Sequence, residues 1–307
     1  MTSTPTNTSP SLMTTLTPRQ FVAPLAQDTP RQWLPGNPVV SAILNAYSVL
    51  VPANENFYIR TLKACMPRVH EVNTRWMIVN FVHQEAQHGV GHRQHWSVLD
   101  AQGYRFRRFE KWVDILTFKT VERIVPLHLR LSAVSCIEHI NAYLAYEFLQ
   151  QNILESAHPS TRALFEWHFA EEIEHKHVTY EVLRELAGGY LVRLLGALLA
   201  APIFYLLMTI GTLKFLRQDG LLFKAATWRQ FGTHLWRANH MALRTLRHLW
   251  NYLRPGFHPN QLDDRALARR VIERYSTAPS IWLQPTARGK QQAGPAVSGA
   301  NPGRDAA

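Results

Sequence analysis

An ordered set of six side chains places the strongest constraint on how this chain can fold. Isolated glutamates alternate along the sequence with Glu-x-x-His pairs, in the order Glu55, Glu85 with His88, Glu138, and Glu172 with His175. Four carboxylates and two imidazoles in this order match the ligands of a dinuclear metal site in a four-helix bundle. We therefore predict an all-α fold that holds a pair of metal ions at these six residues.

The spacing of the glutamates predicts two antiparallel helical hairpins. Glu55 and Glu85 have their midpoint in residues 67–73, where a proline and polar residues indicate a turn. Glu138 and Glu172 have theirs near the turn-forming stretch 155–160. Arms of about 15 residues at ~1.5 Å per residue run out and back over equal lengths. Each hairpin should therefore bring its two acids to the same height.

The predicted ligands also lie within the apolar stripes of their helices. At about 100° per residue, Glu85 shares a face with Phe81, and Glu172 shares one with Phe165. Unpaired carboxylates are costly to bury, and bound cations would compensate them. The same criterion selects Glu172 over the overlapping Glu-x-x-His at positions 174 and 177, which points away from the stripe. The alternative is that these acids are solvated surface charges of an ordinary helical protein.

Four further side chains are candidates to support the site, namely Tyr58, His92, His168 and Glu171. His92 and His168 each lie one helical turn from a predicted ligand, so we expect both to form hydrogen bonds beside the ligands. For His92, a role as a third nitrogen ligand is the alternative. Glu171 lies on the flank of the stripe, where it can orient a ligand or face the substrate. Tyr58 is expected to be a core tyrosine, with a redox role as the alternative.

Several segments resemble the bacterial family named "predicted metal-dependent hydrolases". They are Pro52–Tyr58, Phe81–His88, Glu138–His139, Trp167–Lys176 and the tail motif Leu253–Pro259. More distantly, the ligand order resembles ferritin-like di-iron proteins such as the ribonucleotide reductase small subunit, bacterial multicomponent monooxygenases and acyl-carrier desaturases. This resemblance implies a ferritin-like four-helix bundle and di-iron chemistry with dioxygen. It also implies bridging or switching carboxylates at Glu85 and Glu172, terminal ones at Glu55 and Glu138, and one nitrogen per metal from His88 and His175.

Our leading hypothesis for the function is a di-iron enzyme that activates dioxygen to oxidise, hydroxylate or desaturate a small apolar substrate such as a lipid or acyl chain. Carboxylate-rich sites with two imidazoles suit iron, with manganese or zinc as alternatives. The sequence has no flavin, nicotinamide or iron–sulfur motif, so an oxidative enzyme would need a separate electron donor. The alternatives are a metal-dependent hydrolase, as the family name implies, and a metal-storage or scavenging protein.

The composition of the chain predicts four regions. Residues 1–34 and 285–307 should be disordered, because they are rich in small residues and proline and lack a core-forming pattern. Residues 35–188 should form the metal-binding bundle, made of two hairpins joined by a long crossover. Residues 189–284 should add a hydrophobic helix and basic C-terminal helices. Cys65 and Cys136 lack metal-ligand spacing and should be free thiols in a reducing, cytoplasmic compartment.

The net charge of +11 lies entirely in the C-terminal part of the chain. Residues 1–188 contain 17 basic and 17 acidic residues, whereas residues 189–307 contain 16 basic and five acidic residues. Leu194–Leu213 is uncharged and long enough to cross a bilayer, and a basic, aromatic helix should follow over about 226–253.

Three interpretations of the uncharged segment remain open: a single membrane span, a shallow insertion, and a helix buried against the bundle or a homodimer partner. We favour shallow insertion, which would hold the protein at the inner face of the cytoplasmic membrane through residues 194–253. Arginine mixed with tryptophan beside an apolar segment favours a lipid surface, and we expect no binding of nucleic acid.

Overall fold

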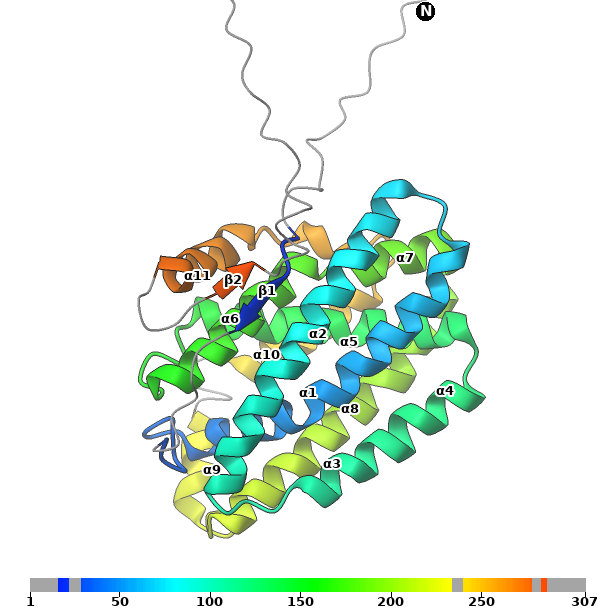
Figure 1. Cartoon of the computed structure of the whole chain (residues 1–307). Helices are drawn as coiled ribbons and strands as arrows, with labels where there is room; N and C mark the ends of the chain where they lie inside the picture. Colours follow the sequence, from blue (N-terminus) through cyan, green and yellow to red (C-terminus); the bar gives the residue numbers. More distant parts are fainter. Residues whose placement is uncertain (1–15, 22–28, 234–239, 278–282, 286–307) are drawn as a thin grey trace, which may run out of the picture.

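Helices make up most of the computed structural model, which describes residues 16–21, 29–233, 240–277 and 283–285 (Figure 1). The long helices are α1 (Pro38–Cys65), α2 (Val72–Ala101), α5 (Leu127–Gln150), α6 (Pro159–His175) and α8 (Tyr190–Gln218). The described strands are only β1 (Arg19–Phe21) and β2 (Leu283–Pro285), which pair antiparallel with Gln20 opposite Gln284. The prediction of an all-α bundle is confirmed.

The two predicted hairpins are α1 with α2 and α5 with α6. The first turn contains the short helix η2 (Met66–Arg68), and the second covers residues 151–158. Pro38 starts α1 at a position that needs no amide hydrogen, and the Asn37 side chain caps the helix by accepting from the Val40 amide at 3.4 Å. The turns therefore lie where the glutamate midpoints predict them.

The crossover between the hairpins is helical. It consists of α3 (Arg107–Val113), the π-helix η3 (Asp114–Lys119) and α4 (Thr120–Ile124), which together run along one side of the bundle (Figure 1). Phe118 of η3 is buried and packs on Phe57 of α1, with ring centroids 5.4 Å apart. The crossover thus covers part of α1.

The fourth predicted helix is broken just after the last ligand. Helix α6 ends at His175, and α7 (Val178–Ala187) starts after a two-residue turn. Lys176 in this turn donates to the Leu262 carbonyl at 2.8 Å and pairs with Asp264. The turn is therefore tied to the loop that precedes α11 (Arg265–Thr277).

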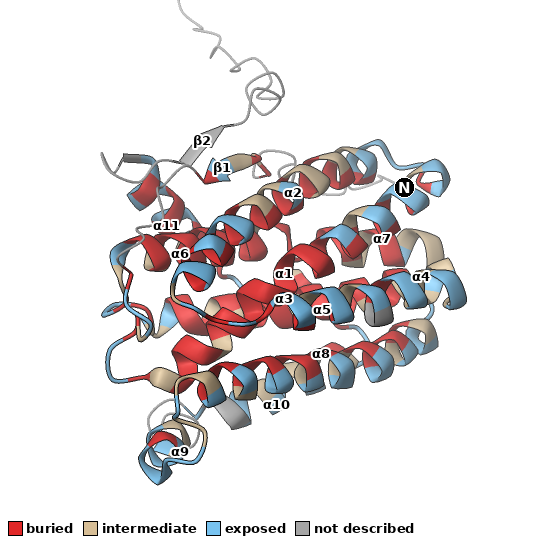
Figure 2. Cartoon of the chain, turned by 60° about the horizontal axis from the view of Figure 1, so that its bottom comes forward, coloured by how far each residue is buried: buried red, intermediate tan, exposed pale blue. Residues whose placement is uncertain are grey.

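Helix α8 packs along α1 and α5 through small residues. A Cβ atom on Gly196 would lie 2.1 Å from Ser132 Oγ, and one on Gly211 would lie 2.8 Å from Ala46 Cβ, so only glycine fits these contacts. The opposite side of the helix is an exposed apolar face, here called the α8 face (Figure 2). It consists of Leu191, Leu195, Leu198, Leu199, Ile203, Leu206 and Ile210.

Among the described residues, α8 is the one helix long and apolar enough to cross a membrane. The basic helix predicted to follow it is divided, into α9 (Ala225–Gly232) and α10 (Met241–Leu253). Residues 234–239 between them lie outside the described residues. A 3-10 turn, η5 (Pro259–Gln261), connects this region to α11.

The N-terminal segment differs from our prediction of disorder over residues 1–34 at the positions that the structure describes. Phe21 is buried and stacks on Trp167 of α6 at 5.4 Å, and Trp33 stacks on Phe165 at 5.6 Å. These aromatic contacts fix residues 16–21 and 29–34 on the bundle, which local composition does not reveal. Residues 1–15, 22–28 and 286–307 lie outside the described residues, as does nearly all of the tail predicted for 285–307.

Candidate metal centre

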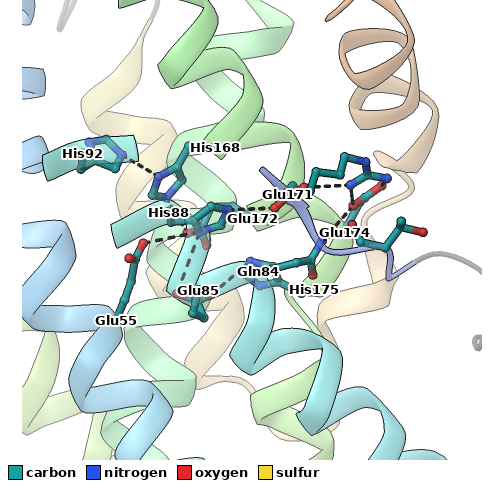
Figure 3. A network of polar contacts seen from close by, with 12 residues as sticks. Glu55, Gln84, Glu85, His88, His92, His168, Glu171, Glu172, Glu174 and His175 are labelled. Atoms are coloured by element: carbon teal, nitrogen blue, oxygen red, sulfur yellow. Dashed lines mark hydrogen bonds and ion pairs between the residues drawn. The ribbon is translucent and has the colours of Figure 1, made fainter. Parts of the chain in front are cut away.

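The six predicted ligands converge from α1, α2, α5 and α6 in the middle of the bundle, where Figure 3 shows five of them. None has more than 3% of its surface exposed. His88 Nδ1 lies 3.4 Å from Glu55 Oε1, and His175 Nε2 lies 3.1 Å from Glu85 Oε1. Together with the contact between His175 and Glu138 of α5, these contacts join all four helices into one polar cluster inside an apolar core.

The cluster contains two overlapping groups of donor atoms that could each hold an ion. One group is formed by Glu55, His88, His168 and Glu172, and the other by Glu85, His88, Glu172 and His175. Within each group the donor atoms lie within 4.8 Å of one another. Because His88 and Glu172 belong to both groups, the two ion positions would be adjacent.

Glu138 lies at the edge of the second group. Its Oε2 atom is 3.1 Å from His175 Nδ1, so His175 is placed between the carboxylates of Glu138 and Glu85. Glu138 is fully buried on α5, the one helix of the four that contributes no donor to either group. The structure therefore brings together all six of the predicted ligands and adds His168.

The hydrogen bonding of the cluster fits bound cations. Both carboxylate oxygens of Glu55, Glu85 and Glu138, one of Glu172, His88 Nδ1 and both nitrogens of His175 have no hydrogen-bond partner among the described residues. Buried polar atoms are rarely left unpartnered. Several nitrogen–oxygen pairs are 3.1–3.4 Å apart without hydrogen-bond geometry. Such a separation, about 3 Å, is that of neighbouring donors around one ion at ~2.1 Å.

Burial shifts the pKa values of the acids and of His88 in opposite directions, and in both cases it favours the neutral form. Desolvation raises the pKa of Glu55, Glu85 and Glu172 well above 4.5, and repulsion from Glu138 adds to each shift. Desolvation also lowers the pKa of His88 well below 6.5, which keeps its imidazole neutral and able to donate a lone pair. A cation would replace the protons that the acids otherwise retain.

Glu171 and Arg19 fix the orientation of His88. His88 Nε2 lies 3.1 Å from Glu171 Oε2 (Figure 3). Arg19 Nη1 donates to Glu171 Oε1 at 2.9 Å. With the Nε2 hydrogen directed to Glu171, Nδ1 is left to face Glu55. A carboxylate that holds the second nitrogen of a ligating histidine is a recurrent feature of metal sites. Of the two roles predicted for Glu171, orienting a ligand and facing the substrate, the structure therefore favours the first.

Sequence reasoning missed Arg19, which also pairs with Glu174 at 2.7 Å. Nothing in the local sequence marks this residue, because it lies in a segment whose composition predicts disorder. Gln84 of α2 donates to the same Glu174 carboxylate at 3.2 Å. Glu174 belongs to the Glu-x-x-His pair that we rejected for metal binding. Its carboxylate has a different role, because it holds β1 against α2 and α6.

His168 and His92 continue the polar network away from Glu172. His168 Nε2 lies 2.7 Å from Glu172 Oε1, and His168 Nδ1 lies 2.7 Å from His92 Nε2 (Figure 3). His92 Nδ1 lies 2.9 Å from Ser48 Oγ. His92 belongs to neither donor group, whereas His168 belongs to one. The structure thus favours His168 over His92 as an additional nitrogen ligand.

Tyr58 and Gly89 shape the side of the site near Glu55. Tyr58 is fully buried, its hydroxyl has no hydrogen-bond partner among the described residues, and burial together with Glu138 raises its pKa. A Cβ atom on Gly89 would lie 3.3 Å from Glu55 Oε2. Glycine at this position lets the carboxylate approach α2 closely.

Comparison with known proteins gives one family. The family described as "predicted metal-dependent hydrolase" matches residues 17–263, a range that includes Arg19 and the whole cluster. No curated protein and no solved structure matches the chain. With more than half of its length covered, the chain belongs to the predicted metal-dependent hydrolase family.

Proposed function

We propose that this protein is an enzyme whose catalytic centre holds two metal ions in the buried cluster. The observation that supports this proposal best is the set of buried carboxylate and imidazole atoms without hydrogen-bond partners. Glu55, His88 and His168 would hold one ion, and Glu85, Glu138 and His175 the other, with Glu172 between them. Iron, manganese and zinc all accept this combination of donors.

Hydrolysis is the reaction that the family description supports, and it has better support than the oxidative chemistry that we predict from the sequence. Two bound ions would supply Lewis acidity and an acidified water molecule for attack on an ester or a phosphate. The residues of the chain position the donors, because Glu171 holds His88 and His92 holds His168. The apolar bundle around them limits the access of other water molecules.

Oxidation with dioxygen is the second candidate, and the burial of the site favours it. Every proposed ligand has at most 3% of its surface exposed, so a small apolar molecule reaches the centre more easily than a bulky charged ester. Bound iron would supply the redox chemistry, and the electrons would come from a separate partner. The phenol of Tyr58 lies buried in the same polar region.

Metal analysis and turnover together distinguish the two reactions. We expect about two metal ions per chain after purification without oxygen. Chelator-sensitive cleavage of an aryl ester or aryl phosphate would support hydrolysis. Bound iron with an absorption band that changes on admitting oxygen, and no cleavage, would support oxidation. Protein that binds no transition metal when reconstituted would contradict both.

We further propose that the α8 face rests on an anionic lipid surface. The face runs from Leu191 to Ile210, about 28 Å at ~1.5 Å per residue, and contiguous apolar surface of this kind marks an interaction site. Residues 189–307 carry 16 basic and five acidic residues, a charge that attracts acidic headgroups. Leu243, Leu246 and Trp250 of α10 are exposed as well.

Vesicle binding tests this membrane proposal. Leu195→Ser with Leu206→Ser should reduce sedimentation with phosphatidylcholine–phosphatidylglycerol vesicles at least fivefold, whereas Val72→Ser, at an exposed position outside the face, should not. Equal sedimentation of all three proteins would contradict the proposal. A dimer that the double variant abolishes, without any vesicle binding, would instead assign the face to a second copy of the chain.

A further inference from the structure

An apolar pocket lies between α1, α5, α8 and the crossover segment. Its cavity volume is about 130 Å³, and its walls include Leu50, Asn54, Phe118, Ile137, Ala200 and Phe204. Asn54 is the one polar residue among those that line it, and no charged side chain does. We name this cavity the crossover pocket. It is chemically unlike the metal cluster and is not part of it.

The crossover pocket lies at the same height along the bundle as the metal cluster. Asn54 directly precedes Glu55 on α1, and Ile137 directly precedes Glu138 on α5. Successive residues of a helix differ by about 100° around its axis and ~1.5 Å along it. The pocket is therefore the next groove around these two helices, at the level of the two acids.

The pocket opens onto the α8 face. Leu199 and Ile203 line the pocket and are 50% and 43% exposed, respectively, whereas Ala200 and Phe204 on the same helix are buried. Ile124, at the end of α4, is also exposed to 72%. A molecule entering at Leu199 would leave an apolar surface and enter an apolar cavity.

The crossover supplies the outer wall of the pocket through an unusual piece of helix. Phe118 belongs to the π-helix η3, and Val121 and Val125 follow it along the wall. Short π-helical stretches are rare and occur frequently at functional sites. Here the irregular turns place Phe118 against Phe57 and leave the cavity beside them.

We propose that the crossover pocket binds an unbranched alkyl chain. An apolar cavity of about 150 Å³ stays dry and takes up a molecule as large as benzene, so this cavity accommodates about six carbons of a chain. The remainder of the chain would extend through the mouth along the α8 face. The assignment of this alkyl chain to the substrate rests on the proposed metal enzyme. The binding of an alkyl chain in the crossover pocket does not.

Two sources can supply the chain, a free fatty acid or the acyl chain of a membrane lipid. Purified full-length protein is titrated with 11-(dansylamino)undecanoic acid, and dodecanoate is used to displace it. A second arm measures extraction of pyrene-labelled phosphatidylcholine from vesicles. Uptake in either arm supports the pocket and identifies the source of the chain. Absence of uptake in both arms would overturn the proposal.

Filling the cavity locates the binding. Ala200→Phe should weaken binding at least tenfold, because its ring occupies the cavity, whereas Ala201→Phe adds the same ring next to it on a side chain outside the lining. Ala133→Leu fills the pocket from α5 and covers the case in which the first variant is poorly folded. Unchanged binding by both filled variants would contradict the assignment.

Metal content, measured on the same samples, separates this inference from the proposed enzyme. All three variants should retain the metal of the wild-type protein, since none touches the cluster. Alkyl binding by protein that holds no metal would contradict the proposed enzyme but support the crossover pocket. Bound metal without alkyl binding would contradict the pocket alone.

Discussion

Arg19 Nη1 lies 2.9 Å from Glu171 Oε1, and this ion pair connects a strand near the N-terminus to the candidate metal centre. The other oxygen of Glu171 lies 3.1 Å from His88 Nε2. Both carboxylate and imidazole are fully buried, so their interaction is only weakly screened by solvent. The orientation of a proposed ligand thus depends on a residue about 70 positions away in sequence.

Replacing Arg19 should weaken metal binding without removing any ligand. In Arg19→Ala, Glu171 loses its cation and holds His88 less firmly, and loss of such a partner typically costs 10–100-fold in metal affinity. Competition with a chelator measures the affinity. Arg31→Ala is the control, because it also breaks an ion pair of the N-terminal segment, with Asp219 at 3.2 Å, away from the cluster. Equal affinities for both variants would show that Arg19 does not support the site.

His168 and His92 can be distinguished by metal stoichiometry. His168→Ala removes a donor of one group, so the variant should hold about one ion per chain instead of two. His92→Ala removes only the partner of His168 and should keep both ions with reduced affinity. Elemental analysis after gel filtration provides the measurement. Two tightly held ions in His168→Ala would mean that His168 serves as a hydrogen-bond partner alone.

Metal affinity should rise with pH. The raised pKa values of Glu55, Glu85 and Glu172 mean that binding must displace protons, whereas the lowered pKa of His88 leaves this imidazole already neutral. Calorimetric titration in buffers of different ionisation enthalpy should detect released protons at pH 7. Binding with no proton release would contradict the shifts.

Stability of the chelated protein should fall with rising pH in the window above about 6.5. An acid whose pKa is raised on folding stabilises the fold below its unfolded value, near 4.5, and that stability is lost as pH passes through the raised pKa. His88, His92 and His168 have lowered pKa values and act oppositely, but only below about 6.5. Thermal melts should therefore show a metal-induced gain in Tm that increases across this window, and a smaller gain in Glu85→Gln. A constant gain would contradict the prediction.

The contact between α8 and α5 should not tolerate a side chain at Gly196. Its added Cβ would meet the backbone of Ser132 at 2.7 Å, so the helices would have to separate. Overpacking of this kind costs about 1–3 kcal/mol, and Gly196→Ala should lower the free energy of unfolding by that amount. Gly189→Ala, where the nearest atom lies 3.9 Å away, should cost less, because only the preference of the α8 N-cap for glycine over alanine is lost. Denaturant unfolding compares the two variants.

The bundle and its six donors can be predicted from the sequence because helical geometry is local. The positions of Glu55, Glu85, Glu138 and Glu172 relative to the turns determine their height, and the apolar stripes determine their direction. Regular helices preserve both quantities over long distances. The spacing and the apolar stripes together are therefore enough to bring these four acids together.

The remaining features depend on contacts between distant parts of the chain. Arg19 reaches Glu171 from a strand that aromatic stacking on Trp167 holds in place, and no local pattern signals that stacking. The end of α6 at His175 coincides with the anchoring of Lys176 by Asp264, 88 positions later. The crossover pocket likewise exists only because α8 covers α1 and α5.

The metal content of a double variant, Glu85→Gln with Glu172→Gln, tests the central claim most directly. Both substitutions keep the size of the side chain and remove its charge, and Glu147→Gln removes a buried acid of α5 outside the cluster as the control. Wild-type protein and the control should each bind about two transition-metal ions per chain, and the double variant fewer than about 0.2. Retention of the wild-type stoichiometry by a folded double variant would contradict the account.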